Sequence, residues 1–280
     1  MSDETILEGS RLSLRRHGGG IAVMRLSNPP MGFMDDAMEN ELERALDAID
    51  ADAGLRVIVV TGGEPGVFVR HFDVGVLEQR ARGLAARGLR FDPARPVPEA
   101  AIHRCLRRIE TSDRIFVAAI NGVAMGGGFE LALACDLRLA EDGNYPLGLP
   151  ETNIALLPGA GGTQRMTRLV GAGRALEWIL LGRTFAPREA ATLGLVNACH
   201  PAPVLEHALR LADALAARHP LALAHVKRLV RQGAGAVPAS AFAEERTLFC
   251  DLFTSERTID TLAGFNASGR SITEPPSRGE

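Results

Sequence analysis

The chain has 280 residues, of which 46% are hydrophobic, and a formal net charge of −3 at pH 7. This length and composition allow one large core or two smaller ones. The small net charge gives no support for binding to nucleic acid or to a membrane surface. The sequence has no apolar run of about 18 residues and no secretory signal at its start, so we expect a cytoplasmic protein with no membrane span.

The four cysteines are scattered along the chain, at Cys105, Cys135, Cys199 and Cys250. They form no C-x-x-C pair and have no matched histidine spacing. The pattern therefore predicts neither a metal site nor a disulfide scaffold, and it fits a reducing compartment.

Short apolar runs predict strands at residues 12–14, 21–26, 55–61, 115–120 and 137–140, with a further strand near Leu147. The runs at 55–61 and 115–120 are continuous and rich in β-branched residues, which suits strands buried on both faces of an α/β layer. Helices are predicted at 37–49 and 98–109, and residues 75–95 as a mobile helix and loop. From Gly162 onward the pattern is almost entirely helical.

The segment Ala118–Cys135 carries the clearest sign of chemistry. A buried strand ends at Asn121-Gly122, three consecutive glycines follow, and an amphipathic helix then begins. Glycines let a backbone approach a ligand, and a helix N-terminus directs unpaired N–H groups toward it. The segment predicts an anion or oxyanion site made of main chain, although a tight strand–helix turn without a ligand gives the same pattern.

Two glutamates lie next to glycine-rich backbone. Glu130 falls in the first turn of that helix, and Glu151 precedes the glycine-rich stretch at 157–162. Two carboxyl groups in apolar surroundings could form a general acid/base pair, because burial and mutual repulsion raise at least one pKa. Taken alone, Glu130 could simply complement the helix dipole.

Two blocks resemble the enoyl-CoA hydratase/isomerase (crotonase) family. Residues 121–136, NGVAMGGGFELALACD, resemble the family signature, and residues 149–165, LPETNIALLPGAGGTQR, resemble its second motif. The resemblance implies an α/β fold in which residues 1–200 form a spiral of β-β-α units. Residues 201–272 would form a C-terminal helical region that drives assembly into a homotrimer or a dimer of trimers. Residues 273–280 are predicted to be a disordered tail.

The resemblance also implies a set of site residues. The N–H groups of Gly127 and Phe72 would form an oxyanion hole, and Glu130 and Glu151 would be the two catalytic carboxyl groups. The residues expected to contact the substrate are His71, Asp73, Gly126, Gly128, Pro158 and Gly159. Those expected to contact its coenzyme A part are Pro30, Met31 and Arg270.

By this resemblance, the expected reaction is hydration of a 2-enoyl-CoA thioester to a 3-hydroxyacyl-CoA. Glu130 would act as base on the attacking water and Glu151 as acid toward C2. Coenzyme A would enter as part of the acyl-CoA substrate, with no tightly bound cofactor and no metal. Enoyl-CoA isomerisation, other acyl-CoA chemistry on the same fold, and non-catalytic acyl-CoA binding are the alternatives.

Two departures from the family pattern affect these expectations. His71 stands where the family has glycine; a positive φ there would be costly for histidine, so we expect a different backbone. This side chain could be packed, face solvent, or contact an unusual acyl group. Gly75 stands where many relatives carry a lysine that helps hold the coenzyme A phosphates, and Arg70, Arg80 or Arg82 could replace it. Residues 265–270 lack the family's usual K-R pair, which leaves Arg270 as the candidate for the 3′-phosphate.

Overall fold

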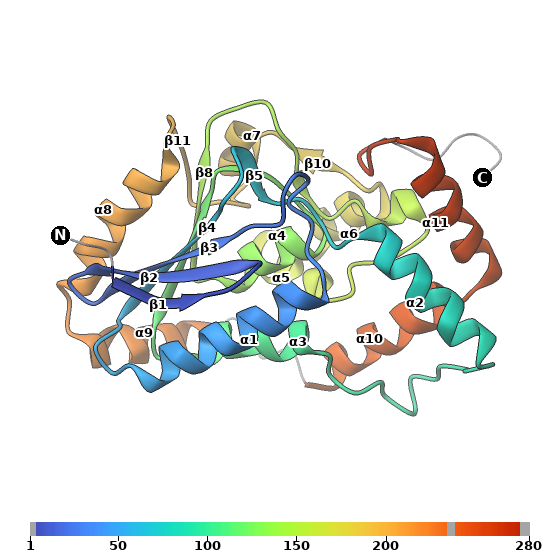
Figure 1. The fold of residues 1–280 in the computed structure, drawn as a ribbon, viewed down its shortest axis with the longest axis horizontal. Helices are drawn as coiled ribbons and strands as arrows, with labels where there is room; N and C mark the ends of the chain where they lie inside the picture. The colour runs from blue at the N-terminus through green and yellow to red at the C-terminus, as the bar shows by residue number, and fades with distance from the viewer. Residues whose placement is uncertain (1–3, 234–238, 275–280) are drawn as a thin grey trace.

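Two β-sheets organise the first two thirds of the chain in this computed structural model, which describes residues 4–233 and 239–274 (Figure 1). The seven-stranded sheet has the order β1 (Glu4–Glu8), β2 (Leu12–Gly18), β3 (Ile21–Leu26), β4 (Val57–Gly62), β6 (Ile115–Ile120), β8 (Leu137–Glu141) and β11 (Ala198–His200). The four-stranded sheet has the order β10 (Thr184–Phe185), β9 (Leu147–Gly148), β7 (Gly122–Met125) and β5 (Gly66–Val69). From β3 to β11 the larger sheet is parallel.

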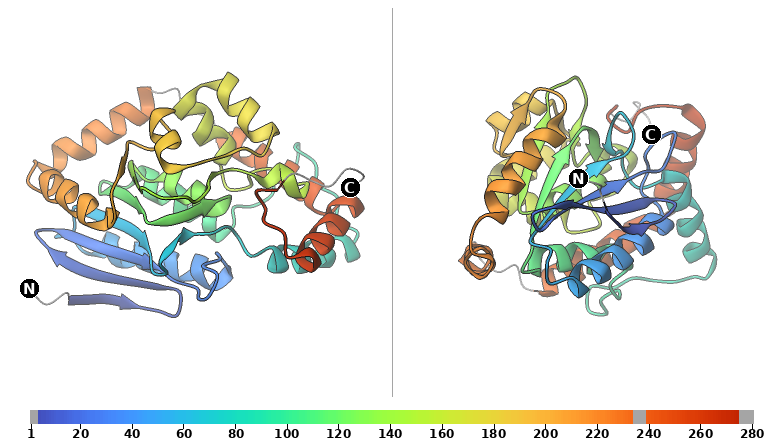
Figure 2. Two further views of the ribbon diagram at one scale, coloured as in Figure 1. Left: turned by 90° about the horizontal axis from the view of Figure 1, so that it is seen from above. Right: turned by 60° about the vertical axis from the view of Figure 1, so that its left-hand side comes forward.

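The described helices are α1 (Asp36–Ala51), α2 (Val74–Ala86), α3 (Ala101–Thr111), α4 (Gly127–Ala134), α5 (Gly162–Val170), α6 (Ala172–Leu180), α7 (Pro187–Thr192), α8 (Val204–Ala216), α9 (Pro220–Gly233), α10 (Ala239–Phe253) and α11 (Glu256–Ser268). A 3₁₀ turn spans Glu151–Ile154. Figures 1 and 2 show α2, α10 and α11 gathered at one end of the molecule, beyond the strands. No helix in the described ranges is long and apolar enough to cross a bilayer.

The central strands are buried on both faces, as the sequence predicts. Successive side chains of a strand point to opposite faces. Val57 and Val59 of β4 accordingly pack in one cluster with Ala208 of α8, whereas Ile58 and Val60 pack in a second cluster with residues of α1 and α3. Strand β6 is buried along its whole length in the same way. The α/β class is therefore confirmed.

Some local predictions differ from the structure. The helix after the three glycines is not amphipathic: α4 is buried from Gly128 to Ala134, so that prediction is wrong. Eight residues are too few for a sequence pattern to show that every face is covered. The sequence analysis missed β1, β5, β7, β10 and β11. The last four have only two to four residues, and β1 (ETILE) has only two apolar residues between its glutamates.

Three other expectations meet the structure only in part. Residues 75–95 begin within helix α2, and whether the segment is mobile stays a prediction. Of the predicted tail, residues 275–280 lie outside the described part of the chain. Glu274 lies in a turn, where its N–H donates to Ser271 O at 3.0 Å. The domain boundary at residue 200 also stays a prediction.

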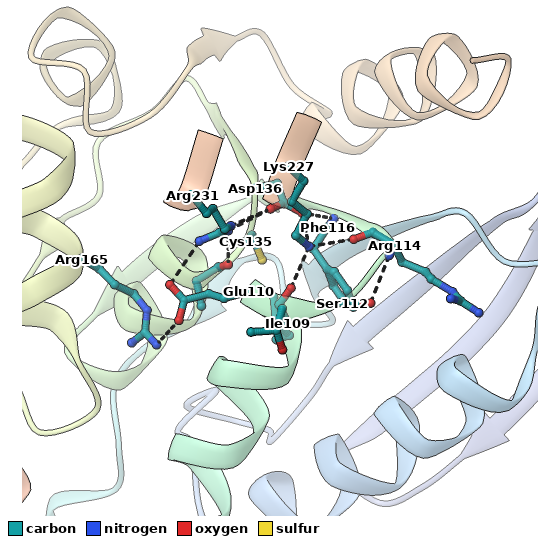
Figure 3. Close-up of polar contacts among 12 residues, drawn as sticks. Ile109, Glu110, Ser112, Arg114, Phe116, Cys135, Asp136, Arg165, Lys227 and Arg231 are labelled. Carbon is teal, nitrogen blue, oxygen red and sulfur yellow. Dashed lines mark hydrogen bonds and ion pairs between the residues drawn. The ribbon is translucent and has the colours of Figure 1, made fainter. Parts of the chain in front are cut away.

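A buried network of charges joins α9 to α3 and to the start of β8 (Figure 3). Lys227 Nζ lies 2.8 Å from Asp136 Oδ2 and also donates to the carbonyl oxygens of Ile109 and Arg114. Arg231 pairs with both Asp136 and Glu110. The three donors of the Lys227 ammonium therefore all have partners, which is what makes its burial tolerable.

Replacing Asp136 by Asn should destabilise the fold, because Lys227 and Arg231 would lose the charge that compensates them. Removing one partner of a buried ion pair typically costs about 3–5 kcal/mol. Urea unfolding followed by circular dichroism measures the effect. Glu8→Gln is the control, since its ion pair with Arg15 is exposed and should contribute at most about 1 kcal/mol. Equal, small losses in both variants would contradict this prediction.

Candidate active site

A cavity of about 510 Å³ lies among α2, the start of α4, the 3₁₀ turn and α10. Much of its wall is apolar, with Leu77 and Leu84 from α2 and Phe249 and Phe253 from α10. Among the ionisable side chains that line it are Glu39, His71, His103, Glu130, Glu151 and Arg246. A mainly apolar pocket with a few polar groups is the usual form of a small-molecule site.

Two backbone N–H groups converge where the ladder between β5 and β7 ends. The last bond of this ladder runs from Met125 N–H to Arg70 O, at 2.9 Å. Beyond it Gly126 turns the chain at φ 49°, and α4 begins at Gly127. Within the described residues, the N–H groups of Phe72 and Gly127 have no backbone acceptor.

These two donors lie close to each other. The nitrogen of Phe72 is 3.9 Å from the position that a Cβ on Gly127 would occupy. The first N–H groups of a helix have no partner inside the helix, so Gly127 N–H is free to bind a ligand. Two such N–H groups facing one cavity can stabilise an oxyanion.

His71 adopts an ordinary backbone conformation, since the only non-glycine residue at positive φ in the described ranges is Ala155. The side chain is 7% exposed, which excludes a solvent-facing histidine. Its Nδ1 lies 2.8 Å from Phe72 O, and because a carbonyl only accepts, Nδ1 is protonated. Burial lowers the pKa of His71 to about 4. The ring is therefore neutral at pH 7, and its Nε2 can only accept a hydrogen bond.

Glu130 is anchored by the loop that precedes α5. Its Oε1 accepts hydrogen bonds from the N–H groups of Ala160 and Gly162, both at 2.8 Å. Burial raises the pKa of Glu130, while these two bonds and the nearby charge of Arg165 oppose the increase. Glu130 is thus a buried carboxyl group whose ionised form is stabilised by two hydrogen bonds and a nearby arginine.

Glu151 has much less support for its charge. It begins the 3₁₀ turn after β9, and its buried Oε2 has no hydrogen-bond partner among the described residues. Its Oε1 lies 3.3 Å from the position that a Cβ on Gly126 would occupy. Burial and the charge of Glu130 raise the pKa of Glu151 well above its ordinary value. The charge of Glu151 therefore has less support than that of Glu130, and Glu151 is the harder of the two carboxyl groups to ionise.

A third glutamate, which the sequence analysis missed, binds the same loop. Glu245 of α10 accepts hydrogen bonds from Gly161 N–H at 2.5 Å and from the Thr163 hydroxyl. Burial and the charge of Glu130 raise the pKa of Glu245 to about 7. The loop thus presents alternate N–H groups to two carboxyl groups, Glu130 and Glu245.

Of the other residues predicted to contact the substrate, only some line the cavity. Gly126 and Gly159 line the cavity. Asp73 caps α2, where its Oδ1 accepts from Gly75 N–H at 2.8 Å. A Cβ on Gly128 would lie 2.0 Å from Val69 O, so glycine here lets α4 pack against β5. Pro158 lies beside Gly162, at 2.9 Å from its would-be Cβ. Asp73, Gly128 and Pro158 are absent from the cavity wall.

The residues expected to contact coenzyme A are also outside the cavity wall. Pro30 follows a cis peptide bond, and the carbonyl of Met31 accepts from Arg70 Nε at 2.8 Å. Met31 is 43% exposed. Arg270 follows the end of α11. Their roles stay predictions.

Among the described residues, no group of three or more His, Cys, Asp or Glu side chains is arranged to hold a metal ion. The groups that do line the cavity are the carboxyl, imidazole and backbone N–H groups described above. Together they offer two N–H donors for an oxyanion and two carboxyl groups with different proton affinities.

Solved structures define the class of protein. The chain superimposes with a TM-score of 0.77 on a putative enoyl-CoA hydratase from Streptomyces avermitilis, at 26% identity, covering 94% of this chain and 93% of that one. With human mitochondrial delta3-delta2-enoyl-CoA isomerase the TM-score is 0.78 at 24% identity, over 92% and 97% of the two chains, which supports the fold alone. The fold is the α/β crotonase fold.

The family model for enoyl-CoA hydratase/isomerase matches residues 16–268. This chain therefore belongs to the enoyl-CoA hydratase/isomerase family, whose members act on coenzyme A thioesters. It is 33% identical over 251 residues to a probable enoyl-CoA hydratase of Bacillus subtilis (strain 168), covering 88% of this chain and 92% of the relative. It is 34% identical over 249 residues to 2,3-dehydroadipyl-CoA hydratase of Escherichia coli (strain K12), covering 88% and 91%.

Glu245→Gln should change how stability depends on pH. The raised pKa means that Glu245 is harder to ionise in the folded chain than in the unfolded one. Its favourable contribution is complete below the ordinary glutamate pKa and is lost as the pH rises through about 7. Between pH 4.5 and 7.5 the wild type should lose on the order of 3 kcal/mol relative to Glu245→Gln. Urea unfolding at several pH values measures this, and parallel stability curves would count against it.

Proposed function

We propose that this protein hydrates a 2-enoyl-CoA thioester to a 3-hydroxyacyl-CoA. The observation that carries the proposal is the difference between two buried glutamates facing one cavity. Glu130 accepts two backbone hydrogen bonds, whereas one carboxyl oxygen of Glu151 has no partner in the part of the chain that the structure describes. Pairs of titratable groups whose environments separate their pKa values are typical of an acid and a base working together.

The proposed reaction begins with the substrate thioester oxygen accepting hydrogen bonds from Phe72 N–H and Gly127 N–H. This draws electrons from the double bond and makes C3 electrophilic. Glu130 removes a proton from a water molecule as its oxygen attacks C3, and Glu151 donates its proton to C2. The two glutamates have then exchanged protonation states, and proton exchange after product release restores the pair.

The expected magnitudes indicate that both parts of the site are needed. Losing one oxyanion donor typically costs about 3–4 kcal/mol of transition-state stabilisation, or ~10²–10³ in rate. A positioned acid or base contributes on the order of 10²–10⁴. Coenzyme A enters only as part of the substrate in this proposal.

Enoyl-CoA isomerisation is the second candidate. It would need one carboxyl group to carry a proton between C2 and C4 of the acyl chain. The observation that favours it is that Glu130 Oε1 is already held by two N–H groups, which leaves Glu151 as the less restrained proton carrier. In this case Glu130 would serve mainly to raise the pKa of Glu151.

We also propose that the chain assembles into a homotrimer or a dimer of trimers. Support comes from large apolar side chains that are exposed on α6, on α9 and between α6 and β10. They are Leu176, Leu180, Leu181, Leu229 and Val230. Groups of exposed apolar side chains mark interaction surfaces. None of these five residues lines the cavity described above, which suits contacts between copies of the chain.

Hydration of crotonyl-CoA, followed by the loss of its enoyl thioester absorbance, tests the leading proposal. Glu130→Gln and Glu151→Gln should each lower kcat by ~10² or more, because each removes a group that transfers a proton. The double variant should be little slower than the slower single one. Glu8→Gln, whose ion pair with Arg15 is exposed, is the control and should keep wild-type activity.

Isomerisation of a 3-enoyl-CoA by the same proteins separates the two candidates. If Glu130→Gln retains this activity while Glu151→Gln loses it, and the wild type does not hydrate crotonyl-CoA, the isomerase alternative holds. If the wild type accelerates neither reaction for any enoyl-CoA tested, the proposed function is wrong.

Light scattering after gel filtration tests the assembly. The mass of one chain is 29.8 kDa, and we expect three or six times this value. Leu180→Glu with Leu181→Glu should lower the measured mass, since a charge placed in an apolar interface is costly. A wild-type mass equal to that of one chain would rule out the trimer.

A further inference from the structure

One face of α10 forms part of the cavity wall. Arg246, Phe249, Cys250 and Phe253 follow helical spacing and all line the cavity. Phe249 contacts the loop that holds Glu130, because its ring lies 2.8 Å from the position of a Cβ on Gly159. Arg246 is the one charged residue among these four.

Arg246 has only part of its hydrogen-bonding capacity in use. Its side chain is 10% exposed, and its Nε donates to Val97 O at 3.2 Å. Its Nη1 is 4.0 Å from Glu99 Oε1, too far for a hydrogen bond, and Glu99 has a closer partner in Arg107 at 2.8 Å. Within the described ranges, the four Nη N–H donors have no hydrogen-bond acceptor.

Two ionisable residues that line the same cavity, His103 and Glu39, give this cation little compensation. The ring nitrogens of His103 are both occupied, by Ala100 N–H and by Gly159 O, and burial lowers its pKa to about 4. Burial raises the pKa of Glu39 to about 7, so near neutral pH it carries only part of a charge. A largely buried guanidinium without a full partner is costly and attracts an anion.

We propose that Arg246 binds a carboxylate on the acyl chain, so that the preferred substrates are 2-enoyl-CoA thioesters whose acyl chain ends in a carboxylate. The proposal rests on the hydration function above and specifies its substrate class. A guanidinium offers paired, coplanar N–H groups that match the two oxygens of a carboxylate. The rest of the acyl chain would lie against the apolar side chains of α2 and α10.

Matched pairs of 2-enoyl-CoA thioesters test this inference. In each pair, of six, eight or ten carbons, one acyl chain ends in a methyl group and the other in a carboxylate. The wild type should have a kcat/KM at least tenfold higher for the carboxylate member of at least one pair. Arg246→Met should reduce that ratio at least tenfold, mainly by raising KM for the carboxylate substrate.

Two further variants make the result specific. Arg246→Lys should keep part of the preference, because it retains the charge without the paired N–H groups. Arg218→Met removes an exposed arginine on the same chain and should leave the ratio at the wild-type value. Thermal unfolding of each variant identifies any that fail to fold. If Arg246→Met does not fold, Arg246→Lys is compared with the wild type instead.

Other outcomes overturn the inference. A wild-type ratio of one or less in every pair would do so while leaving the hydration function intact. So would an Arg246→Met variant that loses activity equally toward both members, since the residue would then bind a coenzyme A phosphate or only hold Val97. If the wild type hydrates neither member of any pair, the hydration proposal fails. Calorimetric binding of the same pairs then decides: equal affinities reject the carboxylate site, and tighter binding of the carboxylate member supports it.

Discussion

The N–H groups at the start of α5 bind two buried carboxyl groups, and the arrangement of the candidate site depends on this. Ala160 and Gly162 direct their N–H groups to Glu130, and Gly161 between them donates to Glu245. The N-terminus of a helix carries partial positive charge and unpaired donors, so it can support anions without a metal. Without these bonds, burying two carboxyl groups here would cost several kcal/mol.

The same anchoring makes the two cavity glutamates chemically different. Glu130 accepts two backbone N–H groups, whereas Oε2 of Glu151, which lines the same cavity, has no donor among residues 4–233 and 239–274. Arg165 extends the arrangement outward, because it donates to Ala160 O and pairs with Glu110 at 2.7 Å. Glu110 also belongs to the network around Lys227 and Arg231 (Figure 3). A continuous series of ion pairs and hydrogen bonds therefore links helix α9 to the loop that holds Glu130.

Features that depend on neighbouring residues could be predicted from the sequence, whereas contacts between distant residues could not. The runs at 55–61 and 115–120 predicted buried strands, because β-branched residues in unbroken succession leave little alternative. The glycines at 126–128 indicated a strand–helix turn, and Gly126 does turn the chain directly before α4 begins at Gly127. Glu130 and Glu151 both line the cavity, and their catalytic roles stay predictions. Glu245 and Arg246 could not be found in this way. Glu245 is 84 residues from the loop it binds, and nothing in its local sequence differs from a solvent-exposed helix residue.

The contribution of α10 has a consequence for the order in which the molecule is completed. Chains emerge from the ribosome N-terminus first, and structure can form before synthesis ends. The strands of both sheets are available once His200 has been made, whereas Glu245, Arg246 and Phe249 are made 45 to 49 residues later. A nascent chain could thus assemble its sheets before α10 exists. At that stage the loop before α5 has no Glu245 to bind, and the cavity lacks the wall that α10 forms. Catalytic competence would then arise only at the last stage of biosynthesis.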